Sequence, residues 1–128
     1  SGVYQEGDYL ALITLSTKGS TVAYAGWKRA FGGKRWFLTV RSGNNLQTAY
    51  SSTQPAMWRW YNVYIRWIGC DKEGSAELWV DGKLVCSVYG LNTISYGPVN
   101  CVRVGLPLLY SCGVTKVYAD SCIIRSYS

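Results

Sequence analysis

The residues best able to do chemistry in this chain alternate with apolar residues in three segments. In residues 35–41, 61–67 and 76–81 every second position is apolar, and the positions between include Arg, Phe, Tyr, Glu and Trp. Sugar rings stack their C–H faces on aromatic side chains, and planar donors beside the ring bind its hydroxyl groups. Arginine adds a fork that fits carboxylated or sulfated sugars. The chemistry indicated is ligand binding.

We predict that one aromatic and Arg-bearing sheet face stacks a polysaccharide, neutral or acidic. The residues expected to form this binding face are Trp79, Tyr64, Arg66, Phe37, Arg41 and Glu77. Trp27 and Trp58, near strand ends, are second-rank candidates. Trp36 and Trp67 fall on the apolar side of their strands, so we expect them in the core. The alternative, that a loop or another domain covers this face, stays open.

Residues suited to catalysis are sparse. The chain has no His, which excludes imidazole as a base, nucleophile or metal ligand. Glycosidases place two carboxylates about 5 to 9.5 Å apart, whereas Glu77 and Asp81 would lie about 13 Å apart along one strand. Asp81 is better explained as a turn former before Gly82. We therefore expect no enzyme, and a glycan lyase or hydrolase using Tyr64 and Arg66 is the third hypothesis.

The charge of the chain is positive, since 13 Lys and Arg oppose seven Asp and Glu, for a net charge of +6. Such a field favours anionic partners. The one local concentration of cations is formed by Lys28, Arg29, Lys34, Arg35 and Arg41. The alternative is a solvated surface with scattered cations.

Five Cys in so short a chain favour an extracellular or cell-surface protein with one or two disulfides. No spacing typical of a zinc site occurs. Cys101 and Cys122 would lie nearly opposite if the last two strands form a hairpin, so we predict this disulfide first, with Cys112 as the other candidate partner. Buried free thiols are the alternative. Because the cysteines point away from the cytosol, we expect no nucleic-acid partner.

Strand signals dominate the chain, and helix signals are nearly absent. No apolar run is long enough for a membrane-spanning helix. We predict one all-β domain over residues 1–128, an antiparallel two-sheet sandwich or jelly roll of about eight to ten strands. The predicted strands are Tyr9–Leu15, Val22–Trp27, Arg35–Arg41, Tyr61–Ile68, Ala76–Asp81, Lys83–Val88, Cys101–Leu106 and Lys116–Ser126.

The order of these strand motifs resembles the concanavalin A-like lectin/glucanase superfamily, which includes laminin-G-like domains. The segments that carry the resemblance are WRWYNVYIRW at Trp58–Trp67, AELWVDGKLV at Ala76–Val85, VRVGL at Val102–Leu106 and KVYADSCII at Lys116–Ile124. The opening Gly7–Ile13 and the later Trp36–Val40 also fit. Such domains usually begin with one more strand, whereas only Ser1–Glu6 precede the opening segment here. Three alternatives stay open: the first strand is absent, a partner supplies it, or it was cut away with a larger parent. We accordingly expect a module excised from a longer extracellular protein.

The resemblance implies a jelly-roll fold and a non-catalytic carbohydrate-binding role. The alternative is an adhesion or assembly domain that binds a protein partner or a second copy of itself. The resemblance also allows either no cofactor or a calcium ion, for which Asp120 matches the family's late-strand Asp. The E-x-D-x-x-E triplet of the family's retaining glucanases is incomplete here, since only Glu6 and Asp8 match it.

Overall fold

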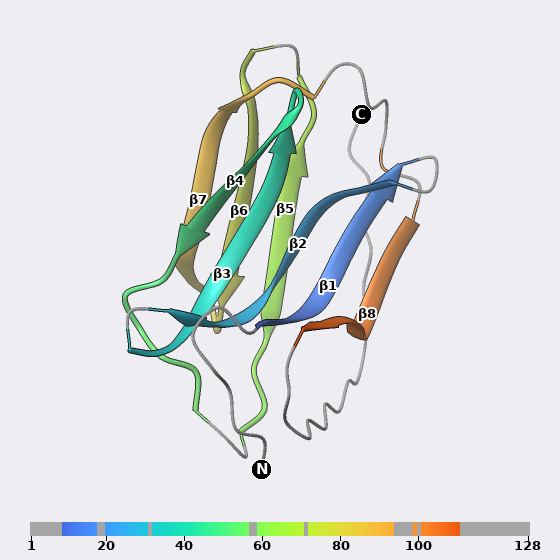
Figure 1. Ribbon diagram of the computed structural model, residues 1–128. Coiled ribbons are helices and arrows are strands. Elements are labelled where there is room, and N and C mark those ends of the chain that lie inside the picture. Colours follow the sequence, from blue (N-terminus) through green and yellow to red (C-terminus); the bar gives the residue numbers. More distant parts are fainter. Residues whose placement is uncertain are drawn as a thin grey trace.

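The chain forms two antiparallel β-sheets in a computed structural model (Figure 1). The structure describes residues 9–17, 20–30, 32–56, 59–70, 72–93, 99 and 101–110. Its strands are β1 (Tyr9–Thr17), β2 (Ser20–Ala30), β3 (Gly33–Ser42), β4 (Asn45–Tyr50), β5 (Val63–Ile68), β6 (Gly74–Val80), β7 (Lys83–Leu91) and β8 (Cys101–Tyr110). No helix in this described part is long and apolar enough to cross a bilayer.

The two sheets differ in size. The larger has the strand order β4-β3-β2-β1-β8, and the smaller has the order β5-β6-β7. Both sheets are antiparallel throughout. The chain therefore has the predicted all-β architecture of two antiparallel sheets, consistent with a β-sandwich.

The core lies between the sheets and follows from the alternation of the strands. In β3 the residues Trp36, Leu38 and Val40 are buried in it, and from the other sheet Leu78 and Val80 meet them. Successive side chains of a strand point to opposite faces, so one apolar residue at every second position fills the core. The predicted core positions on these strands are confirmed.

Seven of the predicted strands overlap observed strands, and one observed strand was missed. β4 lacks the apolar alternation of its neighbours, and its first four residues are exposed. A polar edge strand of this kind carries little pattern in the sequence. The predicted strand Lys116–Ser126 lies outside the described residues.

The cysteines differ from the expectation. Cys70, Cys86 and Cys101 are free thiols, so the predicted Cys101–Cys122 disulfide is wrong. Cys101 lies opposite Ser16 of β1. Cys112 and Cys122 lie outside the described residues, and the extracellular or cell-surface location stays a prediction.

A close approach of two strands leads to a first prediction. A Cβ at Gly26 would overlap the carbonyl oxygen of Leu10 and lie 2.9 Å from Cα of Ala11. These are backbone atoms of a paired strand, which have no room to move. We expect Gly26→Ala to lower the unfolding free energy by at least about 3 kcal/mol, measured by urea denaturation.

The matched control is Gly33→Ala. Its Cβ would meet only the amide end of the Gln54 side chain, at 2.9 Å, and that flexible end can turn away. We expect a change of less than about 1 kcal/mol. An equal fall in the unfolding free energy of the two variants would show that the clash with the β1 backbone is not what destabilises Gly26→Ala.

Cys86 leads to a second prediction. Burial raises the pKa of its thiol to about 12. Between pH 9 and that value the unfolded chain loses this proton and the folded chain keeps it, so the unfolding free energy falls as pH rises. We expect a fall of up to about 1.4 kcal/mol per pH unit that is absent from Cys86→Ala. Urea denaturation between pH 8 and 10.5 measures both slopes, and identical slopes would show that Cys86 titrates normally.

Candidate functional site

The candidate site is the solvent-facing side of the three-stranded sheet, which we call the outer aromatic face. Three cross-strand rows make it up. The first row joins Tyr64, Trp79 and Leu84, the second joins Arg66, Glu77 and Ser87, and the third joins Ile68, Ser75 and Tyr89. Most of these side chains are exposed or half-buried, so aromatic and charged groups lie side by side on an open surface.

The turn between β6 and β7 sets the register of these rows. Asp81 and Gly82 have φ values of 51° and 79°, as a two-residue hairpin turn of type I′ requires. The Asp81 carboxylate accepts hydrogen bonds from the Asn62 backbone N–H at 2.9 Å and from Arg59 at 2.6 Å. The Asp81 N–H donates to the Asn62 carbonyl at 2.8 Å. One residue thus shapes the turn and attaches it to the chain that enters β5.

A shallow hollow lies beside this turn, lined by Asn62, Tyr64, Trp79 and Gly82. Tyr64 is 48% exposed, and Trp79 is half-buried. The indole N–H of Trp79 is buried and has no hydrogen-bond acceptor within the described structure. The hollow therefore combines two aromatic side chains with the Asn62 amide.

The second row carries the charge of the face. Glu77 accepts a hydrogen bond from the Tyr89 hydroxyl at 3.0 Å and lies 3.6 Å from the Arg66 guanidinium. The Arg66 side chain is largely exposed, whereas that of Glu77 is mostly covered. Exposed ion pairs stabilise a fold only slightly, so this pair matters more for the polarity that it gives to the surface than for stability.

Four of the six first-rank residues lie together on the outer aromatic face: Tyr64, Arg66, Glu77 and Trp79. The expectation that Phe37 and Arg41 share that face is wrong, because β3 belongs to the other sheet. Phe37 is 1% exposed and packs edge-on against Tyr9 and Tyr24. Alternation alone tells which residues of a strand share a side, and it does not tell to which sheet the strand belongs.

The remaining candidates lie elsewhere. Arg41 is half-buried on β3, and its Nε lies 3.5 Å from the Thr21 carbonyl. Trp27 packs against the core and meets Trp36 edge to face. Trp58 and Asp120 lie outside the described residues, and the calcium expectation stays a prediction. Among the residues that are described, no group of three His, Cys, Asp or Glu could hold a metal ion.

Sequence reasoning missed Asn62 of the hollow and, among the large side chains of the outer aromatic face, Ile68, Leu84 and Tyr89. The signal for Leu84 was present, since a two-residue Asp-Gly turn pairs Trp79 with Leu84. Tyr89 lies one residue beyond the predicted end of its strand. A register shift between Leu78 and Trp79 makes room for an extra residue in β7, and simple alternation does not locate such a shift.

The chain was compared with known proteins in three ways. No protein-family model, no curated protein and no solved structure matches it.

Proposed function

We propose that this chain is a non-catalytic carbohydrate-binding domain that holds a sugar ring in the hollow between Tyr64 and Trp79. The observation that carries the proposal is the hollow itself. Two aromatic side chains are neighbours across β5 and β6 and remain accessible at the surface, although a solvated sheet face normally carries small polar or charged residues. Aromatic groups held open in this way mark a binding surface.

The polar groups beside the rings supply what a sugar needs in addition to stacking. The Asn62 side chain, which lines the hollow, can bond to ring hydroxyls. One row further along the sheet, Arg66 offers donors and Glu77 offers acceptor oxygens. A ring seated on Tyr64 and Trp79 would thus have apolar contacts below it and donors and acceptors at its rim.

The carboxylates near the hollow support binding more than catalysis. Asp81 is held by Arg59 and by the Asn62 N–H, and Glu77 is held by Tyr89 and Arg66. Each therefore has a structural partner. A general acid and base must instead face a common space across the scissile bond.

A protein partner is the second candidate, and one observation favours it. Ile68, Leu84 and Tyr89 are exposed apolar or aromatic side chains on the same face, and together with Tyr64 they extend across all three strands. Exposed apolar surface that is grouped rather than scattered is typical of protein interfaces. An adhesion or assembly domain would bury this face against a partner or against a second copy.

The proposal predicts a specific loss on mutation. We expect Trp79→Ala and Tyr64→Ala each to weaken the retention of the chain by polysaccharide at least about tenfold, because each removes a stacking surface. The measurement is affinity electrophoresis through gels cast with a panel of neutral and acidic polysaccharides. Thermal unfolding followed by circular dichroism checks that each variant remains folded.

Tyr89→Ala is the matched control, since it removes another exposed tyrosine of the same face, two rows away from the hollow. We expect its retention to change less than about twofold. An equal loss of retention in all three variants would show that the polysaccharide binds to the whole outer aromatic face rather than to the hollow. No retention on any gel, with a dimer or larger assembly seen by light scattering, would replace the carbohydrate proposal with the protein-partner one.

A further inference from the structure

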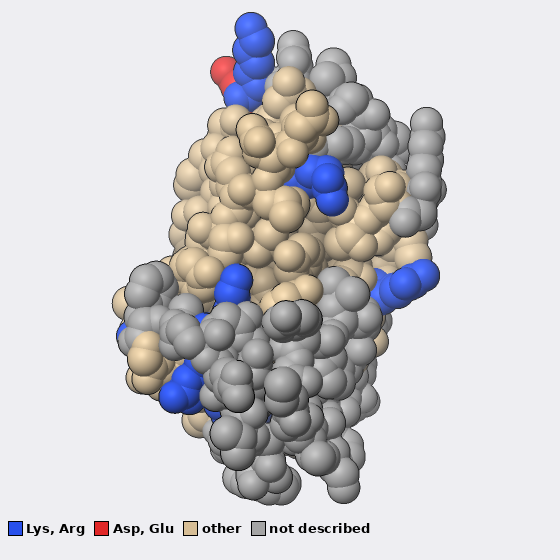
Figure 2. All heavy atoms as spheres, in the orientation of Figure 1, with Lys and Arg blue, Asp and Glu red and all other residues tan. Residues whose placement is uncertain are grey.

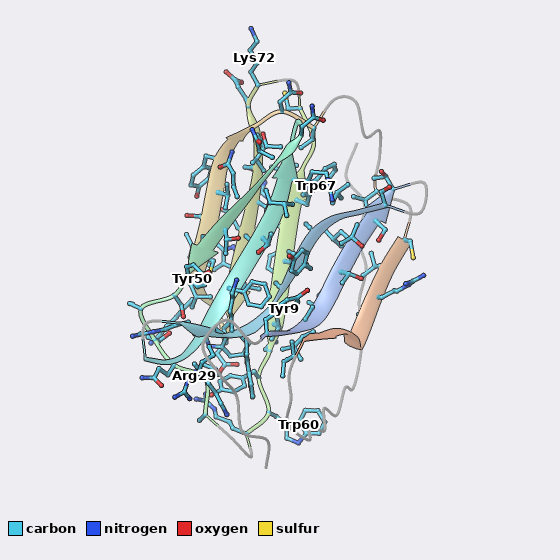
Figure 3. All side chains as sticks on the ribbon, viewed as in Figure 1. Tyr9, Arg29, Tyr50, Trp60, Trp67 and Lys72 are labelled. Carbon is cyan, nitrogen blue, oxygen red and sulfur yellow. The ribbon has the colours of Figure 1, made fainter. Side chains whose placement is uncertain are left out.

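One end of the sandwich gathers cations, and we call it the basic end. Six residues form it: Lys28, Arg29, Lys34 and Arg35 of the β2–β3 hairpin, Arg59, and Lys83 after the β6–β7 turn. The starts of β3 and β5 lie at the same end of the molecule (Figure 1). Arg29 and Trp60 lie at this end and Lys72 at the other (Figure 3). The acidic atoms visible in Figure 2 lie at the tip away from the basic end.

Two like-charged pairs face each other across the hairpin. Lys28 lies opposite Arg35, and Arg29 lies opposite Lys34. Like charges directly opposite in an antiparallel pair destabilise a sheet. The chain also has six more cations than carboxylates, so its own acidic residues are too few to neutralise every cation. Lys28 lies over the Tyr9 and Tyr50 rings, and Arg35 donates to the Ser52 carbonyl at 2.6 Å. The net positive charge gathered at this end, rather than an unpaired cation, is therefore what favours an anionic ligand.

A row of aromatic rings underlies the basic end. Trp27 meets Trp36 edge to face at 5.7 Å, and Trp36 meets Tyr61 in the same way at 5.0 Å. Lys34 lies over Trp27 at 5.8 Å, and Arg59 lies over Tyr61 at 4.6 Å. Cations over ring faces are held in place by attraction to the ring quadrupole. The row therefore fixes one cation at each of its ends.

The basic end is continuous with the hollow. Arg59 bonds to Asp81 at 2.6 Å, and the next residue, Gly82, lines the hollow. Lys83 follows at once. The exposed Trp60 stands between Arg59 and Tyr61 in the chain. A polymer that passes over Tyr64 and Trp79 and continues past this turn therefore meets the cations of the basic end.

We propose that the polysaccharide bound by this chain is acidic, with one ring in the hollow and its carboxylate or sulfate groups on the basic end. This inference rests on the proposed carbohydrate-binding function and names its substrate class. Guanidinium groups and ammonium groups bind such anions through short, charge-assisted hydrogen bonds. Arg29 and Lys34 lie on the side of the hairpin that faces the smaller sheet, as Trp27 and Trp36 do, and are the two residues we assign first.

The aromatic row distinguishes this ligand from a nucleic acid. Strand-binding proteins stack successive bases on open ring faces. Trp27 and Trp36 instead meet edge to face and pack in or against the core, so these two rings do not present the open faces on which successive bases stack. An acidic polysaccharide requires cations and one position at which a sugar ring can stack. The basic end provides the cations, and the hollow provides the stacking position.

The test compares two double variants with the same change of charge. Arg29→Gln with Lys34→Gln removes two cations of the basic end. Lys72→Gln with Arg103→Gln removes two exposed cations elsewhere, in the β5–β6 connection and on β8. Titration calorimetry measures the binding of dextran sulfate, of polygalacturonate and of unmodified dextran, and a thymidine oligonucleotide is the nucleic-acid probe. Circular dichroism confirms that each variant is folded.

We expect the Arg29 and Lys34 variant to bind dextran sulfate at least about tenfold more weakly, and the control variant to change less than about threefold. The unmodified protein should bind dextran sulfate more weakly as salt is raised. This salt dependence needs no variant, so it tests the proposal even if a variant fails to fold.

Different failures separate the two proposals. Equal binding of dextran and dextran sulfate, lost in Trp79→Ala and unchanged by Arg29→Gln with Lys34→Gln, would overturn the acidic assignment and leave the carbohydrate proposal standing. Binding of dextran sulfate that is unaffected by Trp79→Ala would overturn stacking in the hollow. Equal losses in the two double variants would show an unspecific effect of charge and overturn the basic end as a site. Tighter binding of the oligonucleotide than of either acidic polysaccharide would assign the basic end to nucleic acid.

Discussion

The two-residue turn at Asp81 and Gly82 is the constraint on which the candidate site depends. Its positive φ values fix how β7 runs back along β6, and the Asp81 carboxylate ties the turn to Asn62. The register of a strand is strongly constrained, since a shift by one residue moves every side chain of that strand to the other face of the sheet. Tyr64 and Trp79 are neighbours at the surface because β5 pairs with β6, and the bonds between Asp81 and Asn62 hold the start of β5 in register against the end of β6.

Much of this arrangement is predictable from the sequence, for a physical reason. The period of two in β5 and β6 separates the residues that face the core from those that face outward without any knowledge of the fold. Trp36, Leu38 and Leu78 are buried as that period requires. The Asp-Gly pair is also a local signal, because few other residues adopt positive φ at both turn positions. Alternation and turn chemistry are thus sufficient for most strands and for Tyr64 and Trp79 of the hollow.

The features that escape the sequence are the ones that depend on distant contacts. Phe37 and Tyr64 have the same kind of pattern, but one is buried and the other is open, because Phe37 packs against Tyr9 and Tyr24 on neighbouring strands of its sheet. β4 is defined by its pairing with β3 rather than by its own residues. None of these neighbours leaves a local trace in the chain.

The pairing of β1 with β8 has a consequence for how the protein is made. Hairpins such as β6–β7 join residues close in sequence, so they form early, whereas pairings between distant segments pay a larger closure entropy and form late. During synthesis β1 leaves the ribosome long before β8 does. Until β8 arrives, one side of β1 presents unsatisfied N–H and C=O groups, the kind of open strand edge on which polypeptides aggregate. The interval between the synthesis of β1 and that of β8 is thus a period in which this strand edge exposes the nascent chain to aggregation.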